Sequence, residues 1–158
     1  MVQTTGFLAD AMLGRLARWL RVIGADTLQL PFETPDSLLV QRARADARVL
    51  LTRDRHLIRE LRPERAWAVK SEVPLEQLAA VVREFEMPRP HELLTRCLLC
   101  NSPLIELTPV SAQAELPPSA QGLPGPVRRC PTCGRVYWRG SHVRRMEAAL
   151  AVAIPEWR

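Results

Sequence analysis

The sequence predicts an α/β fold, a parallel β-sheet with helices on both faces, followed by a small C-terminal unit built on cysteine pairs. Over residues 6–85, short apolar runs alternate with segments of helical periodicity. This alternation is typical of a parallel sheet that helices cover on both faces. After the segment 87–90, rich in proline, the pattern changes to two C-x-x-C pairs and a proline-rich stretch at 108–126. We therefore expect two parts, residues 1–88 and 89–158.

Local signals place each element of the first part. An apolar strand at 6–9 ends on Asp10, and apolar residues from Met12 to Ile23 then recur at helical spacing as far as Gly24, a typical stop signal. A further helix starts near Pro35, which suits the first helical position, and runs to Ala47. The other expected elements are strands at 27–30, 48–52 and 66–69 and helices at 57–61, 75–85 and about 142–152.

The chain is basic, with a net charge of +5, and its cations are almost all arginine. The planar guanidinium matches phosphate oxygens, so this balance indicates an anionic partner such as nucleic acid, although GC-rich coding also favours arginine. No apolar run reaches the roughly 18 residues that span a bilayer. The first six residues lack the basic start and apolar core of a secretion signal. We expect a cytoplasmic location and no membrane partner.

Four cysteines form two C-x-x-C pairs, Cys97 with Cys100 and Cys130 with Cys133, separated by 29 residues. Two such knuckles complete the closed tetrahedral site of a structural zinc. Gly134, and Asn101 after the first pair, suit the sharp turn that follows a knuckle. Disulfides would suit an exported chain, and a redox C-x-x-C needs only one pair in a thioredoxin-like setting. We therefore favour structural zinc, which with four thiolates has no position left for catalysis.

Three aspartates are expected at one edge of the sheet. Asp10 and Asp54 directly follow predicted strands, and Asp36 lies in the first turn of a helix that begins at the same edge. Ligands of open parallel sheets bind beyond the carboxyl ends of the strands. Converging carboxylates favour a hard cation, magnesium or manganese, which can activate water for attack on a phosphodiester. The alternative is that Asp10 and Asp36 serve only as helix N-terminal residues.

Arginines near these acids are candidates for phosphate contacts. Arg15 and Arg18 follow Asp10 by one and two helical turns, and Arg21 continues the row on the helix face away from the apolar one. Arg53 flanks the end of a predicted strand together with Thr52. The alternative is that these arginines form a solvated basic face.

The C-terminal part carries a second group of candidate RNA contacts, Tyr137, Trp138, Arg139 and His142. Aromatic side chains beside arginines can stack on unpaired bases and hold phosphates. His142 could also assist proton transfer near neutral pH. The alternative is that Tyr137 and Trp138 pack the C-terminal part against the first domain.

Three segments together resemble one known family. They are residues 7–26, which include FLAD and MLGRLARWLR, residues 50–55, LLTRDR, and the cysteine segments RCLLCN at 96–101 and RCPTCGRVYWRGSH at 129–142. In this order they resemble the Mut-seven C-terminal RNase family. The resemblance implies a PIN-like nuclease fold followed by a zinc ribbon, with metal-dependent RNase activity.

The resemblance also bears on the acids. Asp10, Asp36 and Asp54 match the acidic positions of a PIN-like centre. Related PIN-like proteins often carry another acid two residues after the one matching Asp54, where this chain has His56, and Glu72 is a candidate substitute.

We therefore predict a metal-dependent ribonuclease, a hydrolase that takes RNA as its partner, with ribosomal RNA and tRNA as candidate targets. The departure at His56 motivates an alternative, a non-catalytic RNA- or ribosome-binding module. A phosphohydrolase of small phosphate esters ranks below both, because no second acid lies two residues after Asp10.

Overall fold

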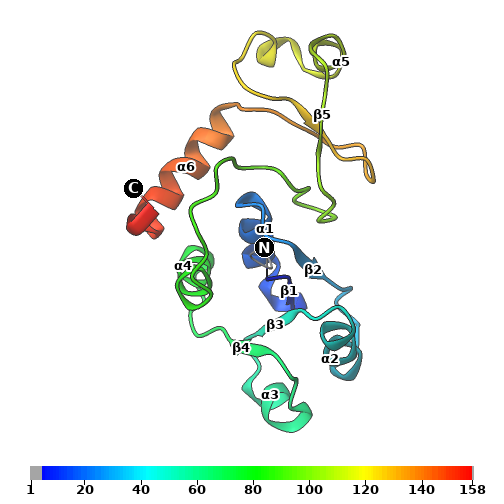
Figure 1. Cartoon of the computed structure of the whole chain (residues 1–158), viewed down its shortest axis with the longest axis vertical. Helices are drawn as coiled ribbons and strands as arrows, with labels where there is room; N and C mark the ends of the chain where they lie inside the picture. The colour runs from blue at the N-terminus through cyan, green and yellow to red at the C-terminus, as the bar shows by residue number, and fades with distance from the viewer. Residues whose placement is uncertain (1–4, 158) are drawn as a thin grey trace.

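A four-stranded parallel sheet forms the centre of the computed structural model, which describes residues 5–157 (Figure 1). Its order is β2-β1-β3-β4, and Leu8 of β1 lies opposite Leu28 of β2 and Leu50 of β3. The predicted α/β class is confirmed. The strands are β1 (Phe7–Ala9), β2 (Thr27–Gln29), β3 (Val49–Thr52) and β4 (Ala66–Ala68).

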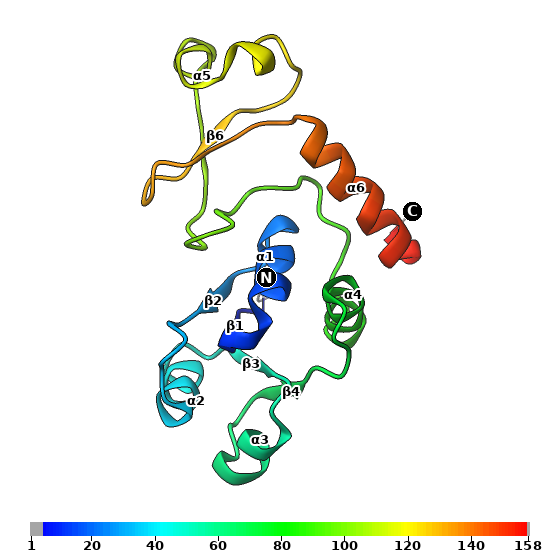
Figure 2. The same ribbon diagram turned by 180° about the vertical axis from the view of Figure 1, so that it is seen from behind.

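Helices cover both faces of this sheet (Figure 2). Side chains alternate along a strand, so β1 sends Phe7 and Ala9 to one face and Leu8 to the other. Phe7 and Ala9 share a buried core with α1 (Gly14–Val22) and α4 (Pro74–Glu84). Leu8 packs instead with α2 (Asp36–Ala45) and α3 (Arg55–Leu61). Both faces are apolar, which explains why the strands read as continuous hydrophobic runs.

The segment after β1 differs from the single helix that we predicted. It forms a 3₁₀ helix, η1 (Ala11–Leu13), before α1 begins. Asp10 caps this turn by accepting a hydrogen bond from the Met12 amide. Met12, expected on the apolar face, is 75% exposed as a result.

The C-terminal part holds a three-stranded antiparallel sheet of order β5-β6-β7. Its strands are β5 (Ile105–Glu106), β6 (Arg128–Arg129) and β7 (Val136–Tyr137). The predicted proline-rich loop contains α5 (Pro109–Glu115) and η2 (Pro118–Ala120), which we did not predict. Thr108 caps α5 and Pro109 is at its first position, a start signal that the composition obscured.

The last helix joins the C-terminal part to the first. α6 (Ser141–Ala153) leads from the ribbon back to α4, and η3 (Pro155–Trp157) follows it. Arg83 of α4 and Glu156 of η3 form an ion pair at 2.7 Å. One continuous apolar core runs from the parallel sheet through Leu98 of the first knuckle to Leu150 of α6. The boundary at residue 88 therefore divides a shared core, and it stays a prediction.

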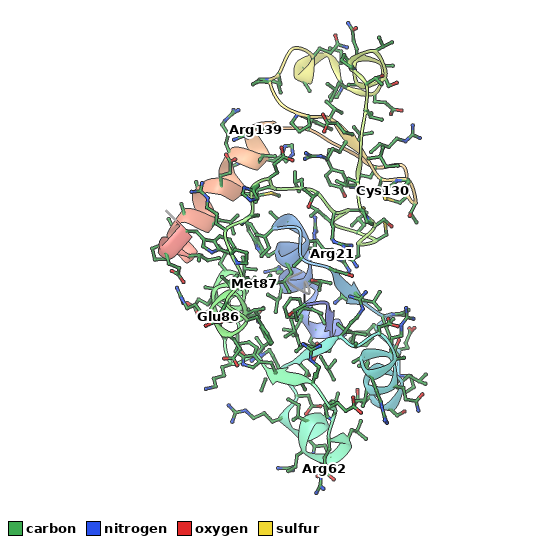
Figure 3. The ribbon with its side chains drawn as sticks, in the orientation of Figure 1. Arg21, Arg62, Glu86, Met87, Cys130 and Arg139 are labelled. Carbon is green, nitrogen blue, oxygen red and sulfur yellow. The ribbon has the colours of Figure 1, made fainter. Side chains whose placement is uncertain are left out.

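A buried arginine holds the first cysteine knuckle on the parallel sheet. Arg21, at the end of α1, donates from Nε to the Thr27 carbonyl at 2.9 Å. Its Nη1 donates to the carbonyls of Leu98 and Leu99 at 2.8 and 3.1 Å (Figure 3). We expected Arg21 on an exposed face with Arg15 and Arg18; those two are exposed, but Arg21 is 4% exposed. That expectation was wrong because the ribbon folds over the end of α1.

A second polar contact reinforces this junction. The Asn101 side chain accepts from the Thr27 amide at 3.0 Å and donates to Asp26 at 2.7 Å. Asp26 also forms a two-point ion pair with Arg48. Burial raises the pKa of Asp26, but the hydrogen bonds from Arg48 and Asn101 outweigh it and hold this pKa below its ordinary value. Because Asp26 and Arg48 precede β2 and β3, the ribbon is docked at the amino edge of the sheet.

No helix among residues 5–157 combines the length and apolarity needed to cross a bilayer. Residues 1–4, which belong to the segment where we expected no secretion signal, lie outside the described residues.

We expect the substitution Arg21→Met to lower the free energy of unfolding by about 2–4 kcal/mol, because it leaves three carbonyls without their buried donor. The matched control is Arg18→Met on the exposed face of the same helix, which should change stability by less than about 0.5 kcal/mol. Urea unfolding followed by circular dichroism measures both. Equal effects at the two positions would show that the junction contributes nothing to stability.

Candidate functional site

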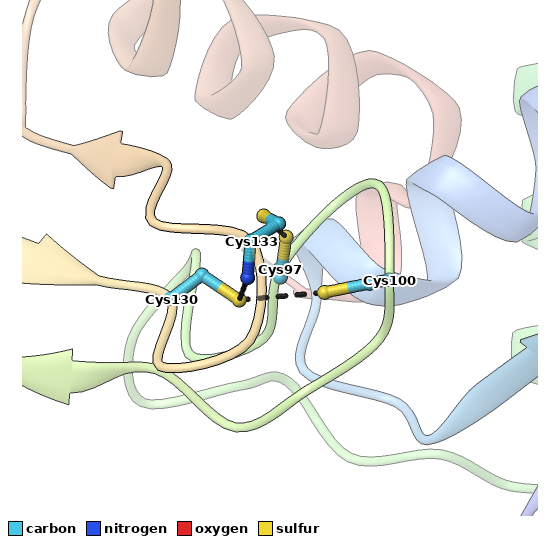
Figure 4. Close-up of side chains that lie close together, drawn as sticks. All are labelled: Cys97, Cys100, Cys130 and Cys133. Carbon is cyan, nitrogen blue, oxygen red and sulfur yellow. Dashed lines mark hydrogen bonds between the residues drawn. The ribbon is translucent and has the colours of Figure 1, made fainter.

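The four cysteine sulfurs gather at one point between the two knuckles (Figure 4). All four lie within 4.8 Å of one another. Cys97 and Cys133 are 3.6 Å apart, and Cys100 and Cys130 are 3.3 Å apart. A tetrahedral zinc with Zn–S bonds of about 2.3 Å needs sulfurs about 3.8 Å apart. The four cysteines could therefore hold a metal such as zinc.

Each knuckle turns back sharply at the residue after its second cysteine. Asn101 and Gly134 both have left-handed backbone angles, with φ of 66° and 75°. The Asn101 amide donates to the Cys97 carbonyl at 3.0 Å, and the Gly134 amide donates to the Cys130 carbonyl at 2.9 Å. These turns are the ones that the sequence predicts, and they aim the two sulfurs of each pair toward the other pair.

Tyr137 supports the cysteine site from within the core. Its hydroxyl lies 3.2 Å from the Cys97 sulfur and accepts from the Leu98 amide at 3.0 Å. Burial raises the pKa of Cys97, but the hydrogen bonds from Tyr137 and from the amides of Cys100 and Leu99 outweigh it and lower this pKa to about 6. Tyr137 is 8% exposed. Its position favours the packing alternative over stacking on a base.

The Thr52 hydroxyl links the Asp10 carboxylate to the backbone amide of Asp54 at the carboxyl edge of the sheet. The Asp10 amide donates to the Leu51 carbonyl at 3.0 Å, which ties the end of β1 to β3. The buried Thr52 hydroxyl donates to Oδ2 of Asp10 and accepts from the Asp54 amide at 3.0 Å. Asp10 is buried, at 8% exposure, and the hydrogen bonds to its two oxygens set the orientation of its carboxylate.

Asp54 and Asp36 are both exposed at this edge. Oδ1 of Asp54 accepts from the amides of His56 and Leu57 and so caps α3. Asp36 is the first residue of α2, the helix that follows β2. Within residues 5–157, only the four cysteines bring three or more candidate ligand atoms within 4.8 Å of one another. The three aspartates share an edge but do not form a group as close as that.

The other polar residues of this edge are paired or solvated. Arg53 contacts Glu72 at 2.7 Å, and this hydrogen bond lowers the pKa of Glu72. His56 lies on the surface with Nδ1 2.9 Å from Arg59. Arg15 and Arg18 are exposed and form no ion pair with any residue from 5 to 157. These two arginines are therefore free to meet a phosphate.

Trp138, Arg139 and His142 lie away from the acids, where the ribbon meets α6. The rings of Trp138 and His142 pack edge to face, with centroids 5.7 Å apart. Arg139 pairs with Glu147 of α6 at 2.7 Å. Because the ribbon is docked at the amino edge of the sheet, these residues form a second group, separate from Asp10 and Asp54.

Two exposed apolar residues, for which the sequence indicated no functional role, also lie at the carboxyl edge. Met12 follows β1 and is 75% exposed, and Phe32 follows β2 and is 80% exposed. A phenylalanine in a loop without helical periodicity is a signal that could have identified Phe32. Large exposed apolar side chains beside a polar site are typical of contact surfaces.

The family model described as Mut7-C RNAse domain matches residues 5–150, which include the aspartates and all four cysteines. This match confirms the resemblance. No curated protein and no solved structure matches the chain.

We expect the purified protein to bind about one zinc ion per chain, and both Cys97→Ser and Cys130→Ser to lose it together with thermal stability, because metal affinity is linked to folding. Elemental analysis and thermal denaturation measure the two effects. The control is Thr132→Ala, which removes only an exposed hydroxyl contact to Ser102. Full metal content in both cysteine variants would contradict the assignment.

Proposed function

The chain belongs to the Mut7-C RNAse domain family, which indicates a nuclease-like or RNA-related function, and from this premise we propose that it is a metal-dependent ribonuclease. The observation that carries the proposal is the Thr52 hydroxyl, which joins Asp10 to the amide of Asp54 at the carboxyl edge of a parallel sheet. This edge is where sheets of this kind bind their ligands. Asp10, Asp36 and Asp54 would bind magnesium or manganese, and the cysteines would hold a structural zinc.

Asp10 and Asp54 keep carboxylate lone pairs that can bind a metal ion. Each carboxylate can accept about four hydrogen bonds or metal contacts, and Asp10 has used two of them, one on each oxygen. Oδ2 of Asp54 faces no hydrogen-bond donor of residues 5–157. The cation would activate a water molecule and neutralise charge on the phosphate. The chain's own contribution is to orient Asp10, and Arg15 and Arg18, exposed on the helix that follows it, would contact the phosphates.

Unpaired RNA is the substrate that this edge suits best. Arg15 and Arg18 offer exposed guanidinium groups to the phosphates. Met12 and Phe32 offer apolar surface at the same edge, where unstacked bases can pack. A duplex hides its base faces and would leave this surface without a contact.

One observation favours a second candidate, a non-catalytic RNA-binding module. Apart from the cysteines, no group of three acids or histidines within residues 5–157 is close enough to hold a metal as it stands. Arg53 and Glu72 also form an ion pair with each other, so Glu72 is not a free metal ligand. This candidate requires RNA affinity without turnover, which the next experiment distinguishes.

We expect labelled single-stranded RNA to be cleaved in the presence of manganese, and both Asp10→Asn and Asp54→Asn to slow cleavage at least about 100-fold, because each substitution removes a metal ligand. Asparagine caps a helix as well as aspartate does, so Asp54→Asn should keep the fold. In Asp10→Asn the new NH2 group faces the buried Thr52 hydroxyl, so circular dichroism checks that this variant is folded. Glu64→Gln, an exposed acid that pairs with Arg44, is the matched control.

Cleavage that survives both aspartate substitutions would refute the ribonuclease proposal. RNA binding by the wild-type protein without any cleavage would establish the second candidate instead.

We expect Phe32→Ser to raise KM for single-stranded RNA about tenfold with little change in kcat, because it removes a contact to a base and leaves the acids in place. Val110→Ser, on α5, removes an apolar side chain of similar exposure and should leave KM unchanged. Initial rates over a range of RNA concentrations measure both. A fall in kcat alone would show that Phe32 positions the acids rather than the RNA.

A further inference from the structure

A cavity of about 180 Å³ lies where residues 89–94, the end of β7 and α6 meet. The indole rings of Trp138 and Trp157 line it, with Arg89 beside them. Pockets for drug-sized ligands have volumes of about 300–1,000 Å³. This cavity is smaller, and its lining extends along α6 from Trp138 before the helix to Trp157 after it, about 20 Å, so it fits a narrow extended segment rather than one bulky ligand.

Both indoles are held in place by the chain itself. The Trp157 Nε1 donates to the Met87 carbonyl at 3.3 Å. The rings of Trp138 and His142 pack edge to face, and a Cβ added at Gly140 would lie 3.0 Å from the Trp138 Nε1. Aromatic groups fixed before binding lose little conformational freedom when a ligand stacks on them.

The charges around the cavity favour an anionic ligand. Two carboxylates line it, but each has an arginine partner: Glu92 pairs with Arg128 and Glu147 with Arg139. Arg89 is exposed and forms no ion pair within residues 5–157. The Arg89 guanidinium therefore remains uncompensated in a cavity that has an aromatic ring at each end.

We propose that this cavity binds a short unpaired segment of an RNA strand, with one base against Trp138, another against Trp157 and a phosphate on Arg89. The combination of aromatic rings and a free arginine is the one that proteins use for single-stranded nucleic acid. The proposal rests on RNA being the ligand, as in the proposed function, but it does not depend on cleavage.

The position of the cavity separates it from the acids. The ribbon is docked at the amino edge of the sheet, whereas Asp10 and Asp54 lie at the carboxyl edge. Between them runs α1, nine residues that span about 13 Å. The RNA segment bound here is therefore distant from the phosphodiester that the aspartates would cleave.

Fluorescence anisotropy with labelled oligouridylate tests the proposal in an Asp10→Asn background, where the RNA stays intact. We expect Trp138→Ala to weaken binding about tenfold and Trp138→Phe less, because phenylalanine retains a ring for stacking. Arg89→Ala should weaken binding about threefold to fivefold. Arg144→Ala, an exposed arginine of α6 outside the cavity, removes the same charge and should change affinity less than twofold.

An oligomer of the same backbone without bases separates base recognition from phosphate recognition. It should bind more weakly than oligouridylate and be insensitive to Trp138→Ala. Equal affinity for both oligomers, or equal effects of Arg89→Ala and Arg144→Ala, would overturn the proposal. If Trp138→Ala does not fold, the Arg89→Ala comparison decides, because Arg89 is exposed.

These outcomes are independent of the ribonuclease proposal. Binding that ignores Arg89 and Trp138, together with cleavage that requires Asp10 and Asp54, would refute only the nucleotide cavity. Binding that depends on the cavity residues in a chain that does not cleave RNA would refute only the ribonuclease proposal.

Discussion

The contact on which the rest of the molecule depends is made by Arg21. Its guanidinium group joins α1, the start of β2 and the backbone of the first cysteine knuckle. Burial of this charge lowers the pKa of Arg21, whereas the nearby Cys97 and Cys100 act to raise it. A zinc ion bound by four thiolates would carry a net charge of about −2, which the buried guanidinium complements. Docking of the ribbon and formation of the metal site are thus expected to stabilise each other.

This docking also decides which parts of the molecule can act together. The hydrogen bonds of Arg21 and Asn101 hold the ribbon at the amino edge of the sheet. A parallel sheet places the residues that follow its strands at the opposite edge, where Asp10 and Asp54 are found. The zinc ribbon therefore cannot supply groups to the acidic edge. An RNA strand that used both regions would have to extend along the first domain.

Features that depend on local sequence were predictable, and features that depend on distant contacts were not. Buried strands followed by Asp10 and Asp54, and cysteine pairs at knuckle spacing, carry their own signals. Arg21 looked like the third arginine of an exposed row, because nothing in the sequence of α1 indicates that its partner is a carbonyl 77 residues away. Tyr137 looked available for stacking for the same reason: its partners, Cys97 and Leu98, belong to the other knuckle.

For Asp10 and Asp54, capping a helix and binding a metal ion are compatible roles. As helix caps, Asp10 accepts from one amide and Asp54 from two. As metal ligands they need lone pairs, and a carboxylate has about four. Capping consumes one or two of these and fixes the direction of the remainder, since a capped carboxylate cannot rotate freely. The hydrogen bond from Thr52 adds the same constraint to Asp10. In the proposed ribonuclease, capping would therefore orient these side chains for the cation, and their structural role would be part of the functional one.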